Sequence, residues 1–152
     1  MMTTWSFCCP QMETLPIRMK ETAHVRPTFT KLPFDKKERI LDVAIDEFSR
    51  CGYEKASINR MVGRLGIAKG SIFQYFGSKK NLYFHIFEYA VRLVKRSLKG
   101  VKAETEGEDF FVRLAKSLQA GIYFIRHHPR VYKIYLKMLF QEDFPFRTDL
   151  LK

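Results

Sequence analysis

The sequence predicts an all-α protein in which a helix-turn-helix pair is followed by longer helices. In several windows, apolar residues recur at i, i+3, i+4 and i+7, which is the spacing of one helix face. Glycine or proline stands where these windows end, as at Gly66, Gly77 and Pro129. The windows before residue 78 are short and those after it are long. We therefore predict two helical parts of different construction.

Residues 1–34 lack this periodicity and hold four of the six prolines, so we predict a disordered leader there. Two interpretations stay open: a disordered arm, or an extraneous stretch ahead of a translation start at Met12 or Met19. Cys8 and Cys9 are adjacent, but no partner ligands lie at a recognisable spacing from them. They therefore do not predict a metal site.

The first helix is predicted to begin after Asp35, a residue type suited to the N-cap, and to continue to about Arg50. Its apolar stripe consists of Ile40, Leu41, Ala44, Ile45 and Phe48, and its polar face of Asp42, Asp46, Glu47 and Arg50. We assign this helix no chemistry of its own. Its role is to support the next two helices, because three short helices must share one small core.

The next two helices are predicted to form a helix-turn-helix. Ser57 can cap the first of them, whose apolar face consists of Ile58, Met61, Val62 and Leu65. Gly66 then suits a left-handed helix end, and Ile67 fills the angle of the turn. The second helix is predicted from about Lys69 to Phe76, burying Ile72 and Phe76 with Phe73 beside them. Ser71, Gln74 and Tyr75 are left on its outside. Ser78 can cap the helix that follows.

The charge of this helix pair indicates what it binds. Residues 57–82 contain Arg60, Arg64, Lys69, Lys79 and Lys80 but neither aspartate nor glutamate, and the acids lie upstream. A compact cationic helix pair suits the groove of duplex DNA. The whole chain has a net charge of +11 and a pI near 9.7, which also favour a polyanionic partner. The alternative is an ordinary helical hairpin whose charges are a solvated face.

Residues 36–82 resemble the DNA-binding domain of TetR-type (AcrR-like) transcriptional regulators. The matching residues are Ile40, Ala44, Phe48, Gly52, Tyr53, Ser57, Gly66, Ile67, Lys69, Gly70, Tyr75, Phe76, Ser78, Lys79 and Leu82. The resemblance implies a DNA-binding domain over residues 35–82 and an effector-binding and dimerisation domain after it. It also implies a ligand-responsive repressor that binds an inverted-repeat operator as a homodimer.

The resemblance also implies roles for single residues. Ser57 and Lys79 lie at helix N-termini, which favour phosphate, and Tyr75 is a further phosphate candidate. Lys69, Gly70, Ser71 and Gln74 are candidates for the major groove, where Gln74 can bind adenine and Lys69 guanine or phosphate. Asn59 is a weaker candidate. Phe73, also among the candidates, stands where a tyrosine is common, and Ala68 stands where serine or threonine commonly caps the helix.

Residues 83–152 are predicted to be an incomplete helical domain. One helix continues to about Gly100, residues 104–109 form a loop, and a second helix ends near His127. The second helix is expected to bury Phe111, Leu114, Leu118, Ile122 and Ile125. A third runs from about Pro129 to Gln141. Phe110, Phe111, Tyr123, Phe124, Tyr132, Tyr135 and Phe140 either line a pocket for an apolar effector or belong to a core or interface.

The end of the chain leaves two interpretations open, because family members continue through two more helices. The chain is either a truncated fragment or a short variant that dimerises through other surfaces. Effector-binding residues cannot be assigned.

Other classes of function are not favoured. No apolar run approaches the roughly 18 residues of a membrane span, and three cysteines suggest no disulfide framework, so we expect a cytoplasmic protein. We find no phosphate loop, nucleophile elbow, paired carboxylates or metal cluster, and predict no catalytic residue, metal or cofactor. A helical protein-interaction module is the remaining alternative to a DNA-binding regulator.

Overall fold

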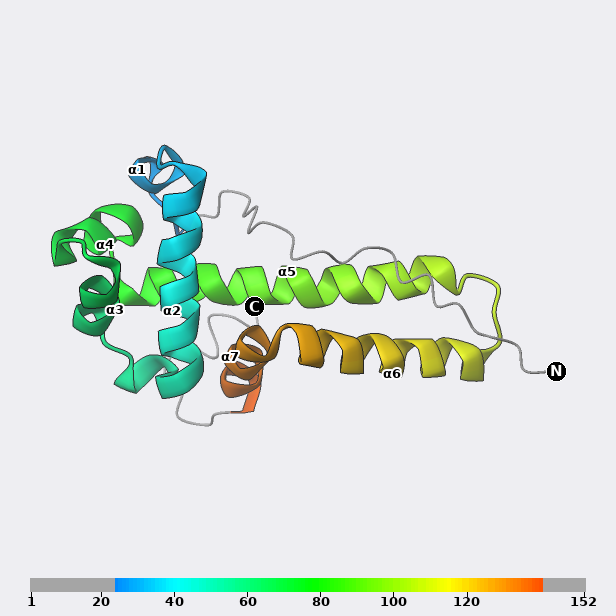
Figure 1. Ribbon diagram of the computed structural model, residues 1–152. Helices are drawn as coiled ribbons and strands as arrows, with labels where there is room; N and C mark the ends of the chain where they lie inside the picture. The colour runs from blue at the N-terminus through cyan, green and yellow to red at the C-terminus, as the bar shows by residue number, and fades with distance from the viewer. Residues whose placement is uncertain (1–23, 141–152) are drawn as a thin grey trace.

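The computed structural model describes residues 24–140, and within them every regular element is an α-helix (Figure 1). The predicted all-α fold is confirmed. In chain order the elements are α1 (Pro27–Thr30), α2 (Phe34–Lys55), α3 (Ile58–Leu65), α4 (Lys69–Phe76), α5 (Lys79–Glu104), α6 (Phe110–His127) and α7 (Pro129–Phe140). The predictions for Cys8, Cys9, Met12 and Met19 lie outside the described residues. Among the described helices, none combines the length and apolar character that crossing a bilayer requires.

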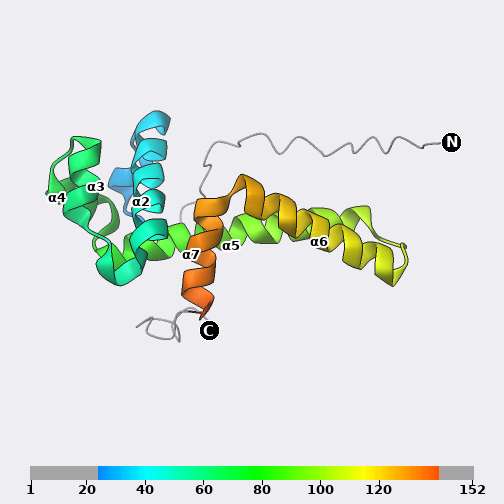
Figure 2. The same ribbon diagram turned by 60° about the horizontal axis from the view of Figure 1, so that its bottom comes forward.

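The helices α1 to α4 cluster around the N-terminal end of α5 (Figures 1 and 2). From that cluster α5 extends as a long rod, and α6 returns along it in the opposite direction. The short helix α7 then packs against both α2 and α5. Arg130 of α7 contacts Asp42 of α2 at 2.7 Å, and Lys137 Nζ donates to the Arg50 carbonyl at 3.2 Å. Helix α7 is thereby attached to α2, the helix that supports the helix-turn-helix pair α3 and α4.

The core of the first half is the one that the apolar periodicity predicted. All five residues of the predicted stripe on α2 are buried, with Phe48 completely enclosed. They meet Met61 of α3, Ile72 of α4 and Leu82 of α5 in one cluster. The bounds of α3 and α4 agree with the prediction, and Gly66 has the left-handed conformation expected of it (φ 68°). Turn chemistry and periodicity therefore sufficed for this part of the chain.

Residues 24–34 differ from the prediction of a disordered leader. They include α1, whose Phe29 is buried in the core against the rings of Tyr75 and Phe76. Helix α2 also begins two residues early, at Phe34, with Pro33 rather than Asp35 at the cap position. The prediction was wrong here because a single apolar side chain anchors the segment. A four-residue helix is too short to show a period.

Helix α2 is interrupted close to its predicted end at about Arg50. Gly52 adopts a positive φ of 71° and a non-helical ψ, and helical turns then resume up to Lys55. Helix α5 differs from the prediction, because it does not stop at Gly100 but continues to Glu104. A glycine inside a helix costs only about 1 kcal/mol relative to alanine, so it need not end the helix.

The apolar stripe of α6 was predicted to face inward, and this was wrong. Its five residues are exposed, with side chains between 38% and 73% accessible. The buried residue of α6 is instead Phe124. At 100° per residue, Phe124 lies about 120° and Ala120 about 160° round the helix from Leu118. Helix α6 therefore uses its less apolar side against its neighbours within residues 24–140.

His85 is a titratable group enclosed by this core. It is 1% exposed, and its ring lies 5.8 Å from that of Phe76 and 6.2 Å from that of Phe29. Burial lowers the pKa of His85 to about 4, and the charges of Arg92 and His24 act in the same direction. The imidazole is consequently neutral in the folded protein at neutral pH.

Replacing His85 with phenylalanine should flatten the pH dependence of stability. Between pH 6.5 and 4 the unfolded chain binds a proton at this residue that the folded chain does not, so stability falls as the pH falls. This amounts to roughly 3 kcal/mol in the wild type. Urea unfolding at pH 7 and pH 4 would measure it, and the loss should be smaller in His85→Phe by that amount. Equal losses in both proteins would contradict the assignment.

Candidate nucleic-acid interface

The turn between α3 and α4 is built from local hydrogen bonds. Ser57 caps α3 as predicted, its Oγ accepting from the Arg60 backbone N–H at 3.4 Å. At the other end, the Ile67 N–H donates to the Val62 carbonyl at 3.2 Å, across the left-handed Gly66. Helix α4 then begins after Ala68, which offers no side-chain cap. These bonds fix the direction in which α4 leaves α3.

Helix α4 has one buried side and one outward side. Ile72, Tyr75 and Phe76 are buried, whereas the outward residues are Lys69, Gly70, Phe73 and Gln74, with Ser71 half-buried. No atom lies within 4 Å of where a side chain on Gly70 would begin, so the helix surface is open at that point. Lys69, Gly70 and Gln74 therefore share the outward side of α4 with Ser71 at its edge, and Asn59 is exposed near the start of α3.

Two aromatic residues of α4 differ from the prediction, because the one expected outside is buried and the one expected beside the core is exposed. Tyr75 was placed on the outside but is only 8% exposed, and Phe73 is 38% exposed. The cause is α1, because Phe29 packs its ring 5.8 Å from that of Tyr75. A role for Tyr75 as a phosphate contact is thus opposed by its burial. Phe73 instead presents an apolar ring on the outward side.

The segment around α1 also caps the C-terminal end of α4. The last carbonyls of a helix have no partner within it. Here the Thr28 hydroxyl donates to the Gln74 carbonyl at 2.7 Å, and the Arg26 N–H donates to the Tyr75 carbonyl at 2.9 Å. The sequence analysis missed these contacts. The one available signal was Pro27, a good first residue for a helix, just before Phe29.

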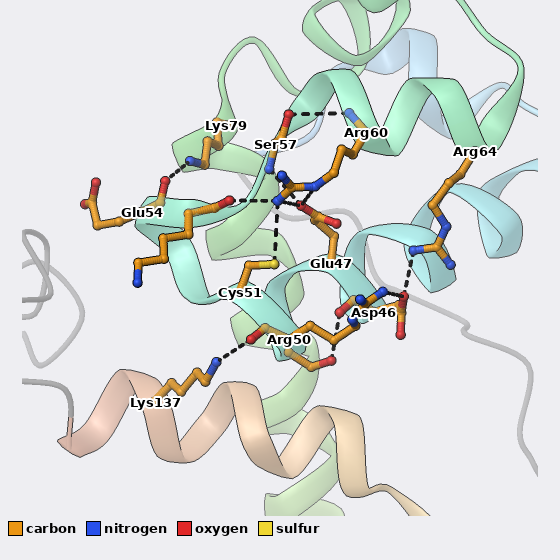
Figure 3. Close-up of polar contacts among 12 residues, drawn as sticks. Asp46, Glu47, Arg50, Cys51, Glu54, Ser57, Arg60, Arg64, Lys79 and Lys137 are labelled. Carbon is orange, nitrogen blue, oxygen red and sulfur yellow. Dashed lines mark hydrogen bonds and ion pairs between the residues drawn. The ribbon is translucent and has the colours of Figure 1, made fainter.

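A buried carboxylate joins α2 to α3 (Figure 3). Glu47 Oε1 accepts from the Ser57 N–H at 2.9 Å and from Arg60 Nε at 2.8 Å. Arg60 Nη2 reaches further, to the Lys55 carbonyl at 2.8 Å and to Cys51 Sγ at 3.5 Å. Glu47 itself is buried. One side chain thus ties the N-terminus of α3 to the middle of α2.

The ionisation of Glu47 follows from these contacts. Burial alone would raise the pKa of Glu47. The hydrogen bonds from Arg60 and from the Ser57 N–H, together with the charges of Arg60 and Arg50, outweigh it and lower the pKa below the usual glutamate value. The carboxylate is therefore charged at neutral pH, and it neutralises Arg60.

The helix pair is less cationic in space than in sequence. Arg60 is paired with Glu47, and Arg64 Nη1 lies 2.6 Å from Asp46 Oδ2. Lys79 Nζ donates to the Glu54 carbonyl at 3.1 Å and lies 4.8 Å from the centre of the Tyr53 ring. Burial lowers the pKa of Lys79, against the attraction of Glu54 and Glu47. Acidic residues of α2 lie beside this segment in space. Counting charges along the sequence could not show this.

A shallow groove of about 570 Å³ lies between the end of α2 and α7. It is lined by Cys51, Gly52, Glu54, Lys55, Leu136, Lys137 and Phe140. Of the aromatic residues considered for an effector pocket, only Phe140 borders it. Phe124 belongs to the core instead, and Phe110 and Phe111 are exposed.

Comparison with known proteins agrees with this geometry. Residues 40–86, which include α3, α4 and the first turns of α5, match the family described as "Bacterial regulatory proteins, tetR family". Over these residues the chain is similar to the TetR family. The structure of a TetR family transcriptional regulator from Chloroflexus aurantiacus is similar, with 37% identity and a TM-score of 0.65. That likeness covers 76% of this chain and 53% of the other.

Two curated relatives are also regulators. The uncharacterized HTH-type transcriptional regulator YvdT of Bacillus subtilis is 37% identical over 76 residues, which is 50% of this chain and 38% of YvdT. An HTH-type transcriptional regulator of Staphylococcus aureus is 23% identical over 126 residues, 78% of this chain and 68% of that protein. A TetR-like regulator from Rhodococcus shares the fold (TM-score 0.68, 20% identity, 80% of this chain and 64% of the other).

The chain spans about half the length of the Chloroflexus structure and a smaller part of YvdT. The family model matches residues 40–86, which run from α2 to the first turns of α5.

Replacing Glu47 with glutamine should lower the free energy of unfolding by about 2–3 kcal/mol, because the buried side chain at this position loses the charge that accepts the hydrogen bonds of Arg60 and the Ser57 N–H. The matched control is Asp46→Asn, which removes the more exposed pair with Arg64 and should cost less than about 1 kcal/mol. Urea unfolding at pH 7 measures both. Because the pKa of Glu47 is lowered on folding, the cost should shrink as the pH falls below the usual glutamate range. Equal costs for the two variants would contradict the role of Glu47.

Replacing Ala68 with serine should stabilise the protein by about 1 kcal/mol, since the start of α4 lacks a side-chain cap. The backbone of Ala68 is already extended (φ −67°, ψ 144°), as an N-cap requires. Thermal unfolding would measure the gain, with Ala68→Val as a control that cannot cap. A gain shared by the valine variant would show that capping is not the cause.

Proposed function

We propose that the chain is a sequence-specific DNA-binding transcriptional regulator that places α4 in the major groove. The observation that carries this proposal is the outward side of α4. It presents Lys69, Gly70 and Gln74 on a short helix whose other side is buried. Small residues allow close approach to the DNA, and amide and ammonium groups can read base edges. The similarity of residues 40–86 to the TetR family supports the same function.

Individual roles are proposed from the geometry. Gln74 is suited to adenine and Lys69 to guanine or phosphate. Phe73 can pack its exposed ring on a thymine methyl group. Ser57 and Lys79 remain proposed phosphate contacts at the N-termini of α3 and α5. Both already have partners within the protein, because Ser57 caps α3 and Lys79 binds the Glu54 carbonyl.

The finer parts of the proposal concern the assembled regulator. We infer a homodimer whose two α4 helices bind half-sites of an inverted repeat about one helical turn apart. Occupation of a promoter would repress transcription. A small apolar effector would release the DNA by favouring a dimer in which the two α4 helices are wrongly spaced. Such a protein acts on chromosomal DNA and hence in the cytoplasm, without a cofactor.

Selection of bound fragments from a random DNA library, at near-physiological salt, tests the proposal. Enrichment of an inverted repeat would support a dimeric regulator, and enrichment of single half-sites would support recognition by a monomer. The absence of any enrichment, with a folded protein, would favour a helical protein-interaction module instead. Affinity for the selected site should fall steeply with salt concentration, since phosphate contacts release counterions.

Replacing Gln74 with alanine should weaken binding to the selected site by about 1–3 kcal/mol, the value of one bidentate base contact, and leave binding to scrambled DNA unchanged. Gln119→Ala on the exposed surface of α6 is the matched control and should change neither. Fluorescence anisotropy with cognate and scrambled duplexes measures the four affinities. An equal loss on both duplexes would assign Gln74 to the phosphate backbone rather than to a base.

A further inference from the structure

Helix α5 carries a row of cationic side chains along the half that lies away from α4. Residues 89–103 contain neither aspartate nor glutamate. The exposed charged side chains of this run are Lys95, Arg96, Lys99 and Lys102. At 100° per residue, these four lie within an arc of about 120° on one side of the helix. The half-buried Val94 and Val101 lie on the other side. The four cationic residues are called the α5 stripe below.

The charges of the α5 stripe are available to a partner molecule. None of the ion pairs within residues 24–140 includes one of its four side chains. Arg92, one turn earlier on α5, differs because it pairs with Glu88 at 3.9 Å. The helix-turn-helix differs as well, since Arg60 and Arg64 are paired with acids of α2. Positive charge that can bind a partner therefore lies on α5 as well as on α4.

The α5 stripe is far from α4. Helix α4 lies at the N-terminal end of α5, from which α5 extends as a rod (Figure 1). At 1.5 Å per residue, Lys95 lies about 24 Å along α5 from Lys79, its first residue. A partner bound along the stripe is therefore separate from whatever the outward side of α4 contacts.

The spacing of the α5 stripe fits a phosphate backbone. From Lys95 to Lys102 the helix rises about 10 Å, and over that length one strand of duplex DNA carries about three phosphates. Gly100 and Ala103, which are exposed beside the stripe, add little bulk. No atom lies within 4 Å of where a side chain on Gly100 would begin. The long cationic side chains can thus reach neighbouring phosphates of one strand together.

Two other anionic partners fit the α5 stripe less well. A helix at a membrane surface inserts an apolar face that is rich in residues such as phenylalanine and leucine. Here the exposed Phe110 and Phe111 follow residues 104–109, which include four acidic residues that an anionic bilayer repels. Protein interfaces are commonly anchored by aromatic side chains, and residues 92–103 contain none. Duplex DNA, which needs only its phosphates neutralised, is the partner that the stripe fits.

We propose that the α5 stripe binds the phosphate backbone of duplex DNA without regard to sequence, at a segment other than the one in contact with α4. This second DNA-binding surface goes beyond the base recognition proposed for α4 and does not depend on it. With both surfaces occupied, one chain holds two segments of DNA near opposite ends of α5.

The first test locates the surface by lysine acylation of the full chain, with and without a scrambled duplex, read by peptide mass spectrometry. The duplex should protect Lys95, Lys99 and Lys102. Lys133, which is exposed on α7, is the control and should be acylated equally in both samples. Unchanged acylation of the stripe would overturn the proposal. So would equal protection of Lys133, because it would indicate general attraction to a cationic protein.

The second test measures how the affinity for a scrambled duplex depends on salt. The chain carries Lys69→Ala and Gln74→Ala, which weaken any contribution from α4. Adding Lys95→Gln, Arg96→Gln and Lys99→Gln should lower the slope of log affinity against log salt by about 2–3, since each phosphate contact contributes about 0.9.

The matched control for this slope removes three exposed cations elsewhere, by Arg113→Gln, Arg126→Gln and Lys133→Gln. It has the same net charge as the stripe variant and should keep the slope of its parent. Circular dichroism should show equal helix content in both. Equal slopes for the two variants would overturn the proposal, because the position of the charge would then not matter.

Other partners are separated by repeating the acylation test with poly-glutamate and with phosphatidylserine vesicles. The duplex should protect the stripe at a salt concentration at which neither of these does. Protection by poly-glutamate as strong as that by the duplex would overturn the proposal in favour of an acidic protein partner. Equal protection by the vesicles would overturn it in favour of a membrane surface.

The outcome is also separable from that of the proposed function. A stripe protected by a scrambled duplex, in a chain that selects no DNA sequence, would leave the second surface standing and refute the sequence-specific regulator. Conversely, a chain that selects a sequence while its stripe lysines stay unprotected would refute the second surface and leave base recognition by α4 standing.

Discussion

The orientation of α4 depends on one buried carboxylate. Glu47 lies inside the domain because two partners at the start of α3, the Ser57 N–H and the Arg60 guanidinium, both reach it. Helix α3 is thereby fixed to α2, and the bonded turn at Gly66 passes that orientation on to α4. A purely apolar core would hold three short helices together but would restrict their rotation less, since apolar packing is not directional.

The C-terminal end of α4 is held by a different set of contacts. Helix α1 is only four residues long and has little stability of its own, yet it places Phe29 in the core and supplies donors to two carbonyls of α4. The start of α4 is therefore held by the adjacent α3, and its end by a segment that lies about 46 residues earlier in the chain. Between these two ends, the outward side of α4 stays exposed, because no other element within residues 24–140 covers it.

The sequence predicted those features that arise from nearby residues. The bounds of α3 and α4, the cap at Ser57 and the left-handed Gly66 depend on short-range periodicity and turn chemistry. The misses depend on residues far apart in the chain. Arg60 and Arg64 looked like free cations because their acidic partners lie on α2, and Tyr75 looked exposed because Phe29 is 46 residues away. Periodicity identified the apolar stripe of α6, but it cannot say whether the same chain or another molecule covers such a face.

The continuity of α5 has a mechanical consequence. This helix begins beside α4 and runs for 26 residues without a break, so it belongs to both halves of the protein. At 1.5 Å per residue it is about 39 Å long. A tilt of about 10° at its far end would move the α4 end by about 7 Å, which is two base-pair steps of about 3.4 Å each. If α4 enters the major groove as proposed, α5 would act as a lever, and a small rearrangement in the second half would be enough to displace α4 along the DNA.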